Sequence, residues 1–192
     1  MHYELSIDGT PDSVPAGTAI LLFHPSTGGT DRFDTGFLNG DVDRFLVVST
    51  RTTADEVKQK LEHYDVDVSR ADILDTLSVE RGYSRRNGEN LHYVNAPDDV
   101  GGIIDVIERF LVGHSGKRRI SFDSLSELAY YAGDDTAADT LERIVSLLSE
   151  YDAVGMFHVS PEVHESSTLR RFRSTGDGVI EVDAEGSVTS TF

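Results

Sequence analysis

Short apolar runs separated by helical segments constrain the fold of this chain most. Helical spacing or capping patterns predict helices over Arg32–Leu38, Thr53–Tyr64, Pro97–Val112, Leu125–Ala132, Thr136–Tyr151 and Val163–Phe172. Runs with the length and composition of strands cover Thr18–Phe23, Phe45–Ser49, Ile73–Val79, Arg118–Phe122 and Val154–Val159. Strands that alternate with helices form βαβ units, so we expect an α/β protein with a mainly parallel central sheet covered on both faces.

The remaining segments predict turns and a closing hairpin. Turn-forming residues fill the first 17 positions, and Arg81–Glu89 has the composition of an exposed excursion. Gly178–Val182 and Ser187–Phe192 predict a C-terminal β-hairpin around the turn Asp183–Gly186. A length of 192 residues suits one domain, which we expect to span residues 1–192.

The charge balance restricts the classes of partner. The chain has 34 acidic and 17 basic residues and a formal charge of −17, while 38% of its residues are hydrophobic. This combination indicates a folded protein with an acidic, solvated shell. The acidic, lysine-poor composition resembles that of proteins from halophilic archaea. Because no basic stripe is present to displace counterions, strong nucleic-acid binding is not expected.

Cysteine usage and hydropathy exclude further classes. With no cysteine, the chain has no disulfide framework, thiolate nucleophile or cysteine metal site. No window approaches 18 uninterrupted apolar residues, and the N-terminus lacks a basic segment followed by an apolar one. We therefore expect a cytoplasmic protein that does not insert into membranes.

The segment after the first apolar run has the setting of a phosphate-binding loop. It reads His24-Pro25-Ser26-Thr27-Gly28-Gly29-Thr30-Asp31. A working loop reads G-x-x-x-x-G-K-S/T, and alignment on Gly29 places His24 at the first glycine, Thr30 at the lysine and Asp31 at the hydroxyl. Loss of a charged hydrogen bond costs about 1.5–3 kcal/mol, so we expect nucleotide binding to be weak or absent. An ordinary glycine-rich turn is the alternative interpretation.

Four segments together resemble a known family. They are the loop region Pro15–Asp31, the strand and exit Phe45–Thr53, the apolar strand Ile120-Ser121-Phe122-Asp123-Ser124-Leu125, and Thr168–Val182 with Asp177-Gly178-Val179-Ile180. In order and spacing they resemble the KaiC-like branch of the RecA superfamily of P-loop NTPases, as a degenerate haloarchaeal member. The resemblance implies a three-layer αβα RecA-like fold.

The resemblance also implies roles for individual residues. It makes Asp123, followed by Ser124, the Walker B carboxylate on the magnesium side; a carboxylate that caps the next helix is the alternative for Asp123. The exit Ser49–Thr53 has no carboxylate to serve as general base, and Ser187–Phe192 has no lysine or arginine to reach a neighbour's nucleotide. We therefore expect no catalytic residues and no meaningful NTP hydrolysis.

These expectations define three candidate functions. The first is a catalytically inactive regulatory or scaffolding module without a cofactor, which binds a protein partner such as a related ATPase or a signalling component; a homo-oligomer is possible. The second is a divergent nucleotide-binding protein or weak ATPase in which Asp31 and Asp123 hold Mg²⁺ with ATP. The third is a RecA relative associated with nucleic acid.

Several other residues could carry chemistry. We expect His158 and His164, near Glu162 and Glu165, to be solvated rather than to bind a metal. His24 either hydrogen-bonds within its loop or simply replaces glycine, and we favour the second. Further expectations are that Ser124 is no nucleophile, that the arginines Arg170, Arg171 and Arg173 pair with Glu162 and Glu165, and that Phe33, Phe37, Tyr130 and Tyr131 pack in or against the core.

Overall fold

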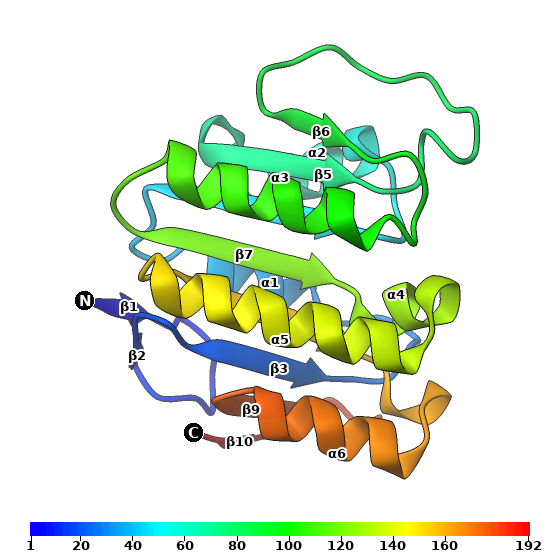
Figure 1. Cartoon of the computed structure of the whole chain (residues 1–192). Helices are drawn as coiled ribbons and strands as arrows, with labels where there is room; N and C mark the ends of the chain where they lie inside the picture. Colours follow the sequence, from blue (N-terminus) through cyan, green and yellow to red (C-terminus); the bar gives the residue numbers. More distant parts are fainter.

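The predicted sheet forms the middle layer of the computed structural model, which describes residues 1–192 (Figure 1). Its eight strands lie in the order β10-β9-β3-β8-β7-β4-β5-β6, and every pairing except β9 with β10 is parallel. The mainly parallel sheet and the C-terminal hairpin are thus confirmed. The strands are β3 (Ala19–Phe23), β4 (Arg44–Ser49), β5 (Ala71–Asp75), β6 (Leu91–Tyr93), β7 (Arg118–Asp123), β8 (Val154–Val159), β9 (Gly178–Val182) and β10 (Val188–Thr191).

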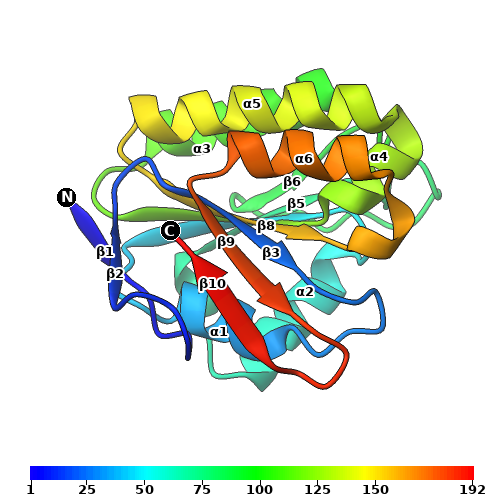
Figure 2. The same ribbon diagram turned by 90° about the horizontal axis from the view of Figure 1, so that it is seen from below.

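Six α-helices cover the two faces of the sheet. Figure 2 shows α3, α4, α5 and α6 on one side and α1 and α2 on the other. The expected three-layer αβα arrangement is therefore confirmed. None of the helices has the length and apolar composition that a membrane crossing requires. Their bounds are α1 (Asp31–Leu38), α2 (Ala54–His63), α3 (Val100–Gly113), α4 (Leu125–Ala132), α5 (Asp134–Glu150) and α6 (Ser166–Thr175).

The central strand β3 contributes to the cores on both sides of the sheet. All five of its residues are buried. Leu21 and Phe23 belong to the core beneath α3–α6, whereas Ile20 and Leu22 belong to the core beneath α1 and α2. Side chains alternate between the faces of a strand, so a fully apolar run is what a strand covered on both sides needs.

Some boundaries differ from the sequence-based prediction. An N-terminal hairpin of β1 (His2–Glu4) and β2 (Ser13–Pro15) occupies a stretch that we expected to contain turns only. The edge strand β6 was not predicted, because its three half-buried residues carry no distinct pattern. Helix α5 begins earlier than expected and α6 lies further along the chain. Short 3₁₀ turns cover Val68–Arg70 and Pro161–Val163.

Asp75 explains why the third strand ends before the predicted Val79. Its side chain is buried and accepts hydrogen bonds from the amides of Leu77 and Ser78, both at 2.9 Å, and from the Ser78 hydroxyl. It also accepts from the Ala54 amide at the start of α2, at 2.8 Å. The carboxylate thereby turns the chain at the end of β5 and fastens α2 to the same edge of the sheet.

We expect Asp75→Asn to lower the free energy of unfolding by about 2–3 kcal/mol, because an amide nitrogen then faces backbone donors that a carboxylate oxygen had satisfied. Urea denaturation measures this loss. Asp55→Asn is the matched control, since Asp55 is exposed and pairs only with Arg86 at 3.0 Å, an interaction worth about 0–1 kcal/mol. Equal losses in the two variants would contradict the role assigned to Asp75.

Candidate functional site

The predicted site segments meet at one edge of the sheet. The loop 24–30, the exit 50–53, the Asp123–Ser124 pair and the segment after β8 each follow the carboxyl end of a parallel strand. The arrowheads of β3 and β7 point to this common side in Figure 1. Ligands of open α/β sheets bind outside such an edge, so the structure brings the candidate residues together as expected.

The glycine pair forms an open turn between β3 and α1. Gly28 and Gly29 have φ values of +97° and +84°, in the left-handed region that glycine adopts without strain. A Cβ built on either glycine would meet no atom within 4 Å. Thr30 precedes α1 at the N-cap position without a side-chain capping bond. The loop is therefore an open turn, and a ligand could approach its backbone closely. Neither His24 nor Phe33 fills the space above the two glycines.

A carboxylate of the chain itself binds an amide of this loop. The Ser26 N–H donates to Glu162 Oε1 at 2.6 Å, and Glu162 belongs to the segment after β8. The Ser26 side chain and, to a smaller extent, this amide lower the pKa of Glu162, while burial acts in the other direction. Backbone amides of such loops are the groups that hold phosphate oxygens in working sites. Glu162 thus occupies a donor that a phosphate would need.

Lys60 holds the residue at the position of the magnesium hydroxyl. Its ammonium group on α2 lies 2.7 Å from Asp31 Oδ1 and 3.5 Å from Asp34 Oδ2, and the Tyr64 hydroxyl donates to Asp31 Oδ2 at 2.9 Å. Burial alone lowers the pKa of Lys60, but Asp34 and Asp31 outweigh it and raise that pKa. Asp31 therefore already has a cationic partner. Our sequence reasoning did not identify Lys60, one of only three lysines in the chain.

Arg51 pairs with the Walker B-like carboxylate. Its guanidinium donates to Asp123 Oδ1 at 2.8 Å. Burial raises the pKa of Asp123, but the charges of His158, Arg51 and Lys60 outweigh burial and lower it. The capping alternative for Asp123 is wrong, because the neighbouring Ser124 is the N-cap of α4 and accepts from the Glu127 amide at 3.1 Å. Asp123 therefore faces cations of the chain itself.

Two buried histidines connect the loop to α1. His24 Nδ1 lies 2.8 Å from the Pro25 carbonyl oxygen, His24 Nε2 lies 3.1 Å from His158 Nδ1, and His158 Nε2 lies 2.9 Å from Asp34 Oδ1. The side chain of His158 is fully buried, and His24 is 2% exposed. The expectation that His158 is solvated is thus wrong, and His24 does hydrogen-bond within its loop.

The hydrogen-bond pattern assigns one positive charge to this histidine pair. A carbonyl only accepts, so His24 Nδ1 carries a proton, and the Asp34 carboxylate requires one on His158 Nε2. The contact between the rings needs a third proton, since two facing lone pairs would repel. Burial and the neighbouring His158 lower the pKa of His24, whereas Asp34 and Asp123 overcome burial and raise that of His158. His158 is therefore the imidazolium.

A serine, a histidine and an aspartate form a second cluster, in which only the Asp134 side chain is exposed, by 42%. Ser126 Oγ lies 2.8 Å from His164 Nε2, and His164 Nδ1 lies 3.2 Å from Asp134 Oδ1. These distances resemble those of a nucleophile triad. Ser126 is only 8% exposed and the His164 side chain 2%, however, so neither offers a surface to a substrate. The cluster joins α4, α5 and the segment after β8. The expectation that His164 is solvated is therefore wrong.

The arginine cluster of α6 also has partners other than those expected. Arg171 pairs with Asp139 at 2.5 Å and with Glu142 at 3.0 Å, both on α5, and Arg173 pairs with Glu181. The expectation that these arginines pair with Glu162 and Glu165 is therefore wrong. Helix α5, which packs beside α6, supplies most of the carboxylates.

The expectation of packing holds for some of the aromatic residues. Phe33 and Phe37 are buried in the core beneath α1, as expected. Tyr131 is half-buried, whereas Tyr130 is 80% exposed, so the expectation for Tyr130 is wrong.

Comparisons with known proteins give a family and a fold. A model of a family of unknown function, DUF7090, matches residues 1–192. A search of the curated proteins finds no match. The solved structures that resemble this chain have low sequence identities, so they show the fold alone.

Three of these structures are the following. An ATPase of the type III secretion system of pathogenic bacteria has a TM-score of 0.66 at 14% identity over 96% of this chain, which spans only 57% of that ATPase. A KaiC-like protein from Pyrococcus horikoshii has a TM-score of 0.64 at 16% identity. The match covers 94% of this chain and 82% of that protein. An uncharacterized protein from the same organism, in complex with an unknown peptide, has a TM-score of 0.68 at 13% identity. The match covers 92% of this chain and 83% of that protein. The predicted RecA-like fold is confirmed.

We expect the charge on His158 to appear in the pH dependence of stability. Its folded pKa lies above the unfolded value of about 6.5, so the stabilisation is complete below that value and is lost as the pH rises through the folded pKa. His158→Gln leaves Asp34 without this cation and should cost about 3 kcal/mol at pH 6, with a smaller loss at alkaline pH. Denaturant unfolding between pH 6 and pH 10 measures both.

His63→Gln is the control for this prediction, because His63 is exposed and has no carboxylate partner. Nitrogen-15 NMR of the imidazoles should find His158 protonated on both nitrogens at pH 6, and His24 neutral with its proton on Nδ1. A neutral His158 at that pH, or a loss that does not change with pH, would refute the assignment.

Proposed function

We propose that this chain, which belongs to the DUF7090 family of unknown function, is a RecA-like protein that does not hydrolyse nucleotides and acts as a regulatory or scaffolding module for protein partners. It acts in the cytoplasm, and its acidic shell suits a salt-rich one. One observation carries the proposal: the Ser26 amide, Asp31 and Asp123, which would hold phosphate and magnesium, are bound to side chains of the chain itself.

The cost of displacing these side chains argues against nucleotide binding. A phosphate would have to replace Glu162 on the Ser26 amide, and a magnesium ion would have to replace Lys60 on Asp31 and Arg51 on Asp123. Because these contacts are partly exposed to solvent, each contributes about 0–1 kcal/mol, and it is their sum that opposes the ligand. Thr30 at the lysine position offers no charge in return. A triphosphate would also lie beside carboxylates, which repel it.

The fold supports a role in protein interaction. A rigid αβα domain that loses its catalytic groups keeps helix faces and loop edges to which other proteins can bind. The neighbour that holds an unknown peptide is a protein of this fold with a peptide bound to it. We propose that the partner is a related ATPase or a signalling component.

One observation favours the second candidate function. The space above Gly28 and Gly29 is open, so the backbone of the loop could still approach a phosphate. In that case Asp31 and Asp123 would exchange Lys60 and Arg51 for Mg²⁺, and the protein would be a nucleotide sensor or weak ATPase. The two candidates differ in whether nucleotide binding is detectable and requires Mg²⁺.

We expect no heat of binding when millimolar ATP is added to the purified protein in 1 M KCl, with or without MgCl₂. We also expect no phosphate from ATP hydrolysis. Calorimetry and a phosphate-release assay measure the two quantities. Capture of a partner should also be equal with and without ATP, because the module has no nucleotide-dependent state.

Variants separate the two candidates. Heat that requires Mg²⁺ and disappears in Asp31→Asn, but persists in the exposed control Asp55→Asn, would establish the nucleotide-binding alternative. ATP turnover by the protein alone or with its partner would overturn the proposal.

A further inference from the structure

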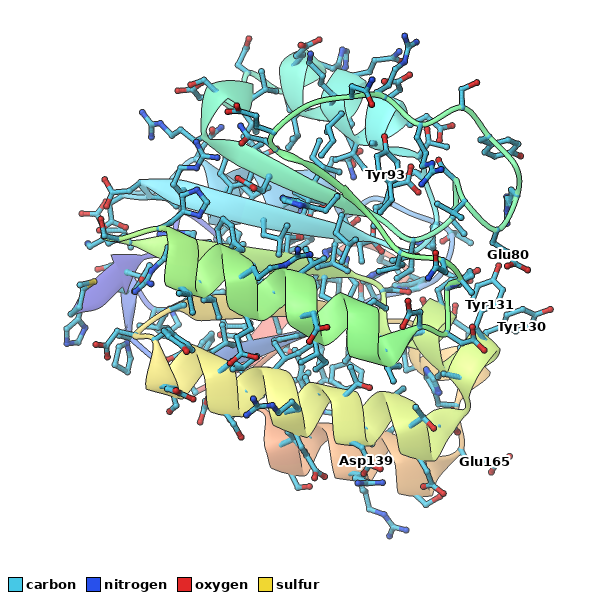
Figure 3. All side chains as sticks on the ribbon, turned by 45° about the horizontal axis from the view of Figure 1, so that its top comes forward. Glu80, Tyr93, Tyr130, Tyr131, Asp139 and Glu165 are labelled. Carbon is cyan, nitrogen blue, oxygen red and sulfur yellow. The ribbon has the colours of Figure 1, made fainter.

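A groove of about 600 Å³ lies outside the last strand of the sheet. One wall contains Tyr93, Val94 and Asn95, where β6 ends, and the other is a flank of α3 with Asp105 and Arg109. Strand β6 has a neighbour on one side only, and Figure 3 shows Tyr93 on the side of α3 that faces away from α5. The groove has the size of a ligand site and shares no residue with the contacts of the carboxyl edge.

Helix α3 forms its wall with residues that the core does not use. The apolar stripe of this helix, which includes Ile103 and Phe110, is buried against the sheet and α5. Residues three and four positions apart lie on one side of a helix, so Asp105, Arg109 and Val112 share another side. All three are exposed, Val112 by 63%. This flank therefore offers both an apolar contact and charges to a partner.

The other wall presents backbone groups without partners. The N–H of Ile73 on β5 donates to the Asn90 carbonyl oxygen at 2.9 Å. Because bonding groups alternate along a parallel strand, the N–H and C=O of Tyr93, three residues further on, point away from β5. No loop or turn hydrogen bond uses the backbone of Tyr93, Val94 or Asn95. Unpaired groups at a sheet edge are the groups with which an added strand pairs.

The two walls are fixed relative to each other. A Cβ on Gly102 of α3 would lie 3.0 Å from Val94 Cγ1, so the helix packs closely on the segment after β6. The Leu91 N–H donates to the Gly88 carbonyl oxygen at 3.2 Å in the turn before β6, which closes the start of the strand. An added strand therefore pairs from Tyr93 onward. It meets preformed walls, which reduces the entropy that binding costs.

The charge of the lining favours a basic occupant. The carboxylates of Asp99, Asp105 and Glu108 line the groove together with one cation, Arg109. Asp105 is exposed and has no cation within 4.0 Å, and Glu108 pairs only with Arg143 at 3.8 Å. A lysine or arginine of a bound segment pairs with Asp105 without displacing another side chain. An acidic segment would instead bring like charge to three carboxylates.

We propose that the groove binds an extended, basic segment of a protein partner as a further strand beside β6, an inference that rests on the proposed function. The N–H and C=O of Tyr93 pair with the backbone of the segment. Side chains of an extended chain alternate between its two faces, so every second one points toward α3, where Val112 gives an apolar contact and Asp105 binds a cation. A small organic cation fits less well, because it would leave the backbone groups unpaired.

Fluorescence anisotropy with defined peptides tests this inference. The probes are a labelled eight-residue peptide of alternating lysine and valine, its glutamate–valine counterpart, and two N-methylated forms of the lysine peptide. One form is methylated on every lysine amide and the other on every valine amide, so each lacks the N–H donors of one edge. In 0.5 M KCl we expect the lysine peptide and only one of its methylated forms to bind. The glutamate peptide should not bind.

Two substitutions in α3 should each weaken binding of the lysine peptide about tenfold. Asp105→Lys replaces an attraction by a repulsion. Gly113→Trp narrows the groove, and a Cβ at Gly113 would meet no atom within 4 Å, so the helix has room for the side chain. Glu62→Lys is the matched control, since Glu62 is an exposed, unpaired carboxylate of α2 on the other face of the sheet. It should leave binding unchanged, and circular dichroism confirms that each variant folds.

Amide NMR should locate the lysine peptide through shifts of the Tyr93 and Asn95 resonances. The inference would be overturned by no binding of the lysine peptide or by equal binding of the glutamate peptide. Binding of both methylated forms, or of neither, would contradict pairing along one edge. Equal effects of Asp105→Lys and Glu62→Lys would show attraction to the acidic molecule as a whole and would also overturn it.

Failure of this inference and failure of the proposed function give different results. Capture of a partner without nucleotide, equally by wild type and by Asp105→Lys and Gly113→Trp, would refute the groove and leave the proposed function standing. Turnover of ATP would refute the proposed function whatever the peptides show.

Discussion

Charge balance within the chain organises the carboxyl edge of the sheet. Parallel strands bring carboxylates to this edge, and in a nucleotide-binding relative a lysine and a metal ion would balance them and the phosphates. Here Lys60 faces Asp31 and Asp34, Arg51 faces Asp123, and the His158 imidazolium lies against Asp34. The cations come from α2, the exit of β4 and β8, so the same contacts also hold the elements together.

Under the proposed function, this arrangement explains how the fold is stable without a nucleotide at this edge. Removal of a ligand from a charged pocket leaves carboxylates that repel one another, and burial makes that repulsion costly. The cations of the chain itself remove this cost permanently. The edge is then a stable part of the structure, and surfaces outside these contacts, among them the groove beside β6, are available for other binding.

Much of the architecture could be predicted from the sequence because its signals are local. The buried run of β3, the capping box of Thr53 and Glu56, and the spacing of apolar residues in α3 each define an element within a few residues. The order of these elements then fixes the sheet. The early end of β5 was not predictable, because it depends on Asp75 bonding to α2, a segment some twenty positions earlier in the chain.

The candidate site was predictable in position but not in its contacts. The loop, Asp123 and Ser124 were identified from their places after strands, whereas the partners Lys60, Arg51 and Asp34 come from other elements and have no motif. His24 and His158 are 134 positions apart and meet only because β3 and β8 are neighbours. Exposure of Tyr130 likewise depends on which face of α4 packs against the sheet.

The most direct test of this account is NMR of the Lys60 ammonium group and of the Ser26, Gly28 and Gly29 amides during titration with ATP and MgCl₂. If internal side chains replace the metal and the phosphates, these resonances stay unchanged up to millimolar nucleotide. Saturable shifts of the loop amides, together with release of Lys60 from Asp31, would contradict it.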